Sequence, residues 1–212
     1  MPRAGLTREA VVAEAARIAD EVGYERLTLA AVAERFGVAV PSLYKHVDGL
    51  SALRRELTVL AIGELGVALE GAVREAEEGV RAIATAYRDF ARSHPGRYAA
   101  TIRAVDPADA EAAAASDAVL GTVLSVLSAY GLTGADAIDA TRALRAALHG
   151  FVALEAAGGF GLPQDVDRSF DRLVDMLDAA MRAWTPARIS RRRVPPSDAS
   201  VAGSRRARHR RP

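Results

Sequence analysis

Apolar residues recur every three or four positions along most of the chain, as they do on one face of an α-helix. Residues 7 to 22 show the first such pattern, with Val11, Ala15, Ile18 and Val22 in step. Further helical segments are expected at 28–36, 41–47, from about 50 into the seventies, 79–93, around 98–102, 107–130, 134–157 and 164–184. Alternating apolar and polar runs typical of strands are missing, so the sequence predicts an all-α protein of about nine helices.

The segment from Thr28 to Val47 predicts two short helices separated by a tight turn. Thr28 is a suitable N-cap, because its hydroxyl can accept a hydrogen bond from the first turn. Gly37 can adopt a left-handed backbone conformation after the first helix, and Pro41 is favoured at the first position of the second. Leu43 and Val47 should point inward. This leaves a polar, basic outer face, which is the pattern of a helix-turn-helix DNA-binding element.

The run from Ala33 to Val47, AERFGVAVPSLYKHV, resembles the DNA-binding signature of the TetR family of transcriptional regulators. A small residue in the first helix, a Gly-Val turn, a Ser before Leu-Tyr and a closing His-Val carry the resemblance, which extends over roughly residues 7 to 55. The alternative is an ordinary three-helix element with an exposed Tyr-Lys-His face.

The resemblance implies how these residues would contact double-stranded DNA. Thr28 would bind phosphate, Val40, Pro41 and Ser42 would face base edges, and Tyr44, Lys45 and His46 would lie near the backbone or the groove edge. Phosphate contacts set the register, whereas base contacts discriminate sequence. The chain departs from the family at the next helix start, where Asp48, Gly49 and Leu50 replace an expected lysine.

The resemblance also implies a division of the chain and a homodimer. Residues 1–50 would bind DNA, residues 51–184 would form the effector-binding and dimerisation domain, and residues 185–212 would be a basic, disordered tail. The last two long helices have broad apolar faces, which would suit either an intramolecular core or a twofold four-helix interface. The residues expected at that interface are Leu148, Val152, Phe170, Leu173 and Leu177.

Two further segments, residues 88–98 and Leu148-His149-Gly150-Phe151, resemble a regulatory domain of some TetR-family proteins that is named for a Trp-His-Gly consensus. Leu148 stands where the Trp is expected. The residues that could line an effector cavity are Tyr87, Phe90, Tyr98, Ile102, Val123, Leu127 and His149. The same residues would equally suit core packing. Because few are polar, the expected effector is a small apolar or aromatic molecule.

The composition gives no support to a metalloprotein, an enzyme or a membrane protein, which are the alternatives to a regulator. The 212 residues include no cysteine and four histidines without metal-ligand spacing, so we expect no metal site, no cofactor and no enzyme activity. No apolar run reaches the roughly 18 residues that span a membrane, and no signal peptide is visible, so a cytoplasmic location is expected. From Thr185 onward nine arginines oppose one aspartate, a formal charge of +8, which would attract phosphate.

Together these features predict a ligand-responsive DNA-binding regulator, most often a repressor in the resembled family, released from a palindromic operator by a small molecule. Two alternatives remain open at this stage. One is a constitutive DNA binder without an effector, and the other is a helical carrier or enzyme that shares the fold.

Overall fold

The computed structural model describes residues 6–103, 105, 106 and 108–185 of the chain. Within these residues the protein is all-helical, as predicted, with eight α-helices and two 3-10 helices and no strand. The elements are α1 (Arg8–Val22), η1 (Tyr24–Arg26), α2 (Leu29–Phe36), η2 (Val40–Lys45), α3 (Gly49–Glu75), α4 (Gly79–Ser93), α5 (Pro95–Thr101), α6 (Ala110–Ala129), α7 (Gly134–Ala156) and α8 (Val166–Arg182).

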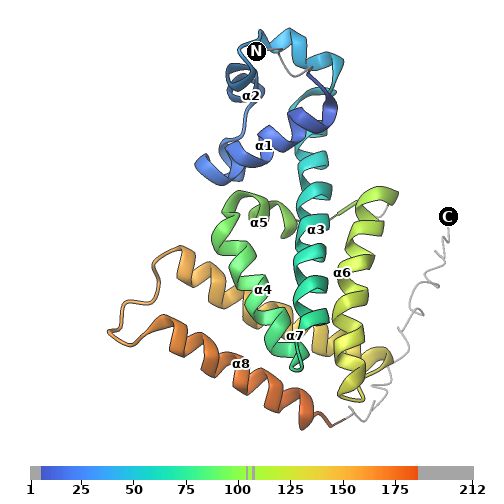
Figure 1. Cartoon of the computed structure of the whole chain (residues 1–212), viewed down its shortest axis with the longest axis vertical. Helices are drawn as coiled ribbons and strands as arrows, with labels where there is room; N and C mark the ends of the chain where they lie inside the picture. Colours follow the sequence, from blue (N-terminus) through green and yellow to red (C-terminus); the bar gives the residue numbers. More distant parts are fainter. Residues whose placement is uncertain (1–5, 104, 107, 186–212) are drawn as a thin grey trace, which may run out of the picture.

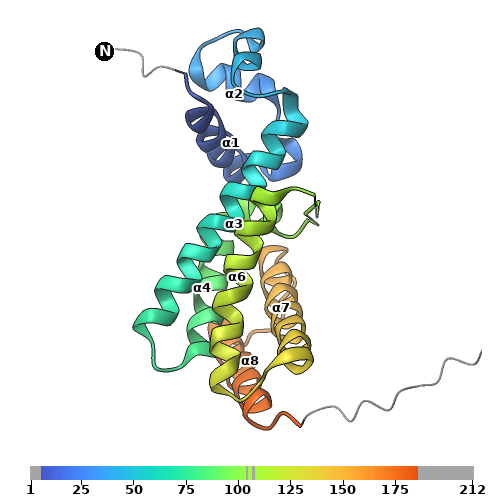
Figure 2. The same cartoon turned by 90° about the vertical axis from the view of Figure 1, so that its right-hand side faces the viewer.

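The molecule is elongated, with the first two helices at one end and α7 and α8 at the other (Figure 1). The long helix α3 runs from the N-terminal end into the body, where α4 and α6 lie against it (Figures 1 and 2). One apolar core joins α1, α2 and the first half of α3, ending at Ala61. A second begins at Leu65 and joins the rest of α3 to helices α4 to α8. The boundary between the two cores therefore falls inside one continuous helix.

Helices α1 and α2 each begin at a threonine N-cap, and the cap predicted at Thr28 is confirmed. The Thr7 hydroxyl accepts from the backbone N–H of Ala10 at 3.1 Å, and the Thr28 hydroxyl accepts from that of Ala31 at 3.1 Å. These bonds satisfy N–H groups that a helix start leaves without a partner.

The start of α6 differs from the prediction. A helix was expected from position 107, but it begins at Ala110 and its cap is Asp109, which accepts from the N–H of Ala112 at 3.1 Å. Asp106 instead accepts from the N–H of Ala108 at 2.9 Å, which closes a short turn before the helix. Both acids can cap, and the ion pair that Asp109 makes with Arg55 favours the later start.

Helix α6 has the length and the mean hydropathy, 1.5, of a membrane-crossing segment. In this fold it lies along α3 in both views and contributes Val123, Val126 and Leu127 to the core of the body (Figure 2). Its hydropathy comes from alanine, valine and leucine together, and a core helix passes the same test. The helix therefore gives only weak evidence of a membrane span.

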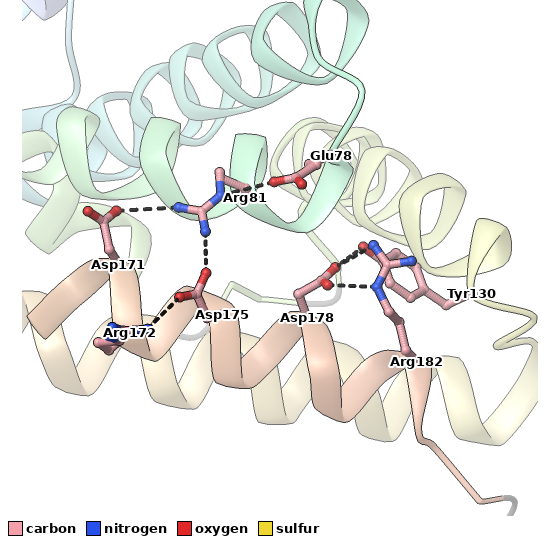
Figure 3. A network of polar contacts seen from close by, with 8 residues as sticks. All are labelled: Glu78, Arg81, Tyr130, Asp171, Arg172, Asp175, Asp178 and Arg182. Atoms are coloured by element: carbon pink, nitrogen blue, oxygen red, sulfur yellow. Dashed lines mark hydrogen bonds and ion pairs between the residues drawn. The ribbon is translucent and has the colours of Figure 1, made fainter. Parts of the chain in front are cut away.

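Helix α8 is joined to α4 by charged pairs as well as by apolar packing. Phe170, Val174 and Met181 of α8 are buried. Beside this apolar stripe, the Arg81 guanidinium of α4 lies between Asp171 and Asp175 (Figure 3). These pairs are partly exposed, so they fix the position of α8 rather than dominate its stability.

Candidate nucleic-acid interface and effector cavity

The helix-turn-helix element has the predicted turn but a tighter second helix. Gly37 has φ 63° and ψ 36°, the left-handed conformation that ends α2. The second helix, η2, is a 3-10 helix over Val40–Lys45 rather than an α-helix. Leu43 is fully buried and Val47 is 3% exposed, so both point inward as predicted. These two anchors hold the remaining side chains of the element on the outside.

None of the seven predicted DNA-contact residues is buried in the structure. Tyr44 is 56% exposed, although it is a large aromatic residue. Thr28, Pro41 and Lys45 are also exposed. The other three are half-buried: Val40, Ser42 and His46. Among the described residues Lys45 has no acid within ion-pair distance, so its charge is available to a phosphate or a base.

The short helix α5 connects the N-terminal three-helix unit to the body. Its Gly96 lies so close to the backbone of Ala19 and Asp20 in α1 that no side chain would fit there. The Asp20 carboxylate accepts from the backbone N–H of Arg97 at 2.9 Å, and the Arg97 guanidinium also pairs with Glu64 of α3 at 2.8 Å. A movement of α5 or α3 must therefore carry α1 with it.

Three more ion pairs, made by two arginines, cross the same junction. Arg55 of α3 pairs with both Asp109 and Glu111 at the start of α6. Arg103, just after α5, pairs with Glu25 of η1 and lies 5.2 Å from the centroid of the Tyr24 ring. None of these pairs is visible in the sequence, because each joins residues 54 or more positions apart.

The Arg55–Asp109 pair predicts a pH dependence of stability. The guanidinium of Arg55, together with the N–H of Ala112, lowers the pKa of Asp109 from its ordinary value of 3.8 to about 2. Because the folded pKa is the lower one, this stabilisation is present above the ordinary value and is lost as pH falls toward about 2. Asp109→Asn keeps an oxygen for the helix cap but has no charge.

We therefore expect the unfolding free energy of Asp109→Asn to fall less steeply than that of wild type as the pH is lowered. Urea titrations between about pH 2 and pH 6 measure this slope. Asp139→Asn, which removes an equal charge from an exposed pair on α7, is the control and should follow wild type. Identical slopes for all three proteins would contradict the assignment.

A cavity of about 480 Å³ lies in the body between α3, α4, α6 and α7, beside the segment that follows α5. Most of its wall is aliphatic, and Leu65, Leu69, Ile83 and Leu144 are among the residues that line it. This size is within the roughly 300–1,000 Å³ of small-molecule sites. The cavity also touches Arg103, so its wall and the junction to the N-terminal unit share a residue.

Three of the seven predicted effector residues, Tyr87, Ile102 and Val123, line this cavity. The other four do not. Leu127 is fully buried in the core and Phe90 packs edge-to-face on His94 at 5.3 Å. The remaining two, Tyr98 and His149, lie behind Tyr87.

Tyr87, Tyr98 and His149 form a chain of hydrogen bonds that leads from the cavity wall into the core. The two tyrosine hydroxyls are 3.0 Å apart, and the Tyr98 hydroxyl is 2.6 Å from Nδ1 of His149. Burial raises the pKa of both tyrosines, so they remain protonated donors over the physiological range. All three residues were predicted to line an effector cavity. They do lie together, but only Tyr87 lines the cavity.

Comparison with known proteins identifies the family to which this geometry belongs. Residues 11–56 match the model of the bacterial regulatory proteins of the tetR family, and residues 80–177 match a tetracyclin repressor-like C-terminal domain. An uncharacterized HTH-type transcriptional regulator of Mycobacterium tuberculosis is 40% identical over 86% of this chain and 84% of its own length. The chain belongs to the TetR family of transcriptional regulators.

A second relative of this TetR-family regulator is an uncharacterized HTH-type transcriptional regulator of Bacillus subtilis. It is 38% identical and covers 78% of this chain and 87% of that protein. A Rhodococcus protein of unknown function has the same fold, with a TM-score of 0.70 and 26% identity over 83% of this chain and 95% of its own. A TetR variant from Acinetobacter baumannii in complex with minocycline aligns with a TM-score of 0.62 and 23% identity, over 84% of this chain and 97% of its own. This similarity shows that the two proteins share a fold.

The expected dimer-contact residues of this TetR-family regulator need revision. Leu148, Val152 and Phe170 are only 1–4% exposed, because they pack in the core of the protomer itself. Leu148 also lines the cavity. Leu173 and Leu177 of α8 are half-buried, so some of their surface remains accessible. The three buried side chains can offer no area to a partner, whereas Met176 on α8 is 67% exposed.

Sequence reasoning missed several residues of this site. Arg145, Ser116, Thr141 and Leu120 line the cavity of this TetR-family protein, and none was predicted to do so. Helical periodicity indicates that α6 and α7 have apolar sides, but it does not indicate that part of each side faces a space instead of another side chain. No group of three or more His, Cys, Asp or Glu side chains able to hold a metal occurs in the described part of the chain.

Proposed function

We propose that this regulator is a homodimeric repressor that leaves a palindromic operator when a small molecule enters the cavity of its body. The observation that supports this most directly is the position of Arg103, which lines the cavity and pairs with Glu25 in the N-terminal unit. A ligand that rearranges this side chain changes a contact on which the placement of the DNA-binding element depends. Proteins of the family bind DNA as dimers and respond to small molecules, and a TetR neighbour in the comparison holds minocycline.

The DNA-binding surface of the proposal is the exposed face of η2 with the start of α2. Tyr44 and Lys45 project from a short helix whose buried Leu43 holds it rigidly. Pro41 and Ser42 would face the base edges, while the N-terminus of α3, at Gly49, presents backbone N–H groups suited to a phosphate. Asp48 is the N-cap residue of that helix and makes no side-chain hydrogen bond there. Positions 48–50 hold no other cation in place of the expected lysine.

The dimer surface of the proposal is the outer side of α7 and α8. Ile138 and Leu154 of α7, Leu162 of the connecting loop and Met176 of α8 are exposed apolar side chains on these elements. A twofold interface that covers them would place two DNA-binding elements about 34–36 Å apart, one helical turn of DNA. A ligand then acts by population shift, because it favours whichever conformer it binds better.

A footprint of the purified full chain on the DNA upstream of its own coding sequence tests the proposal. We expect two protected half-sites one helical turn apart, with protection lost when an effector is added. One isolated half-site would contradict the dimer. If no member of a broad ligand panel removes the protection, the protein is instead a constitutive DNA binder.

Replacing Tyr44 or Lys45 by Ala should weaken operator binding about tenfold or more without unfolding the protein, since each such contact contributes roughly 1–3 kcal/mol. Arg74→Ala is the matched control for Lys45→Ala, because it also removes one positive charge, from an exposed position at the far end of α3. Mobility shifts measure the affinity and circular dichroism the fold. If both variants bind like wild type, the assigned DNA surface is incorrect.

A further inference from the structure

One end of the cavity is basic. Arg145 of α7 lines the cavity and donates a hydrogen bond to the carbonyl of Thr101 at 3.3 Å. Arg103, two residues after Thr101, lines it as well, and its guanidinium reaches Glu25 of η1, so both arginine residues belong to the end that faces the N-terminal unit. Within the described ranges no carboxylate lies within ion-pair distance of Arg145, whereas most other arginines of the body have one.

Apart from this basic end, most of the cavity wall is apolar. Leu65, Leu69, Ile83 and Val123 supply the apolar part, and the hydroxyl of Tyr87 is already bonded to Tyr98. A molecule that fills the cavity would thus bury a hydrocarbon body; the hydroxyls of Ser116 and Thr141 could meet an uncharged polar group, but only the two arginines offer a positive charge. An anion there would meet a guanidinium, which binds a carboxylate through two parallel hydrogen bonds.

The wall also holds one acid, Asp117 of α6. This carboxylate is exposed and has no cation within ion-pair distance in the part of the chain described. Its charge opposes the entry of an anion and thus weakens such binding. Removing the charge of Asp117 should therefore strengthen the binding of an anion, whereas removing the charge of Arg145 should weaken it.

We infer that the ligand of this cavity is an apolar molecule with a single carboxylate, which binds at the end formed by Arg145 and Arg103. This inference rests on the proposed function and specifies its ligand class. The carboxylate competes with Glu25 for Arg103, so binding loosens the contact of Arg103 with η1 and its stacking over Tyr24. An uncharged analogue of the same shape fills the cavity without this competition.

Isothermal titration calorimetry on the full chain tests the ligand class. The probes are hexanoate, octanoate, decanoate, dodecanoate and 4-phenylbutyrate, each paired with its own primary amide. We expect at least one carboxylate to bind about 10- to 100-fold more tightly than its amide, the range of a charge-assisted hydrogen-bonded pair. If no carboxylate is preferred over its amide, the inference is overturned.

Variants locate the preference within the cavity. Arg145→Gln should reduce it several-fold, because only Arg103 then remains at this end, whereas Asp117→Asn should strengthen carboxylate binding several-fold and leave amide binding unchanged. Both positions are exposed, so both variants should fold, and thermal unfolding checks this. A preference as large in Arg145→Gln as in wild type, or carboxylate binding that Asp117→Asn does not strengthen, contradicts the assigned site.

Mobility shifts with the upstream DNA separate this inference from the proposed function. In wild type the preferred carboxylate should release DNA and its amide should not, and Glu25→Gln should bind that carboxylate several-fold more tightly because Arg103 has lost its competitor. If the protein binds no upstream DNA, the proposed function fails while calorimetry still decides the ligand class. If carboxylate and amide release DNA equally well, the inference alone fails.

Discussion

Replacing Gly96 by Ala should lower the melting temperature by roughly 6–12 °C, which corresponds to about 3 kcal/mol for a chain of this size. A methyl group at this position would overlap with the backbone of Ala19 and Asp20 in α1. Overpacking against a flexible side chain can relax, but here the obstacle is a helix backbone. Either α5 or α1 must move, and the ion pair of Asp20 with Arg97 moves with them.

Gly121→Ala is the control for this substitution. Gly121 lies in the interior of α6, and nothing comes within 4 Å of a methyl group added there. Alanine favours a helix by up to about 1 kcal/mol over glycine, so this variant should be as stable as wild type or slightly more stable. Differential scanning calorimetry compares the three proteins. An unchanged melting temperature for Gly96→Ala would mean that α5 does not pack on α1 as closely as described.

Replacing Arg88 by Ala should destabilise the body by about 2–4 kcal/mol. Arg88 of α4 is 6% exposed and pairs with Glu155 of α7 and Asp167 of α8. Its guanidinium also lies over the Phe170 ring, 4.5 Å from the centroid, and 5.5 Å from that of Phe151. Without it Glu155 is left largely buried and without its cation, and the two rings lose the group packed against them.

Arg92→Ala, one turn along the same helix, is the matched control for Arg88→Ala. The Arg92 side chain is 56% exposed and its guanidinium is 3.6 Å from the same Asp167. An exposed pair of this kind contributes less than about 1 kcal/mol. Urea denaturation should therefore separate the two variants clearly. Equal losses would show that the burial of Arg88 has no energetic consequence.

The helix-turn-helix element could be predicted almost completely from the sequence. The caps at Thr7 and Thr28, the turn at Gly37 and the buried anchors Leu43 and Val47 all depend on residues within a few positions of one another. Hydrogen bonds and conformational preferences at that range are set by residue type. The one local miss was the 3-10 geometry of η2, since Pro41 suits the first turn of either kind of helix.

The body could be predicted only as a set of amphipathic helices. Leu148 was assigned to a dimer surface and Leu127 to a cavity, and both lie inside the protomer. An apolar side chain has the same signature whether it meets the core, a cavity or a second copy of the chain. Periodicity therefore cannot separate these three environments.

Local order was thus determined by the sequence alone: which segments are helical, which side of each helix is apolar, and which short segment carries Tyr44 and Lys45. Only the tertiary structure decided that Arg103 reaches both the cavity and Glu25, that Arg145 lines the cavity, and that Gly96 touches α1. The physical reason is distance along the chain. Contacts between residues many positions apart depend on how all the helices pack together, and no local pattern of residues specifies that packing.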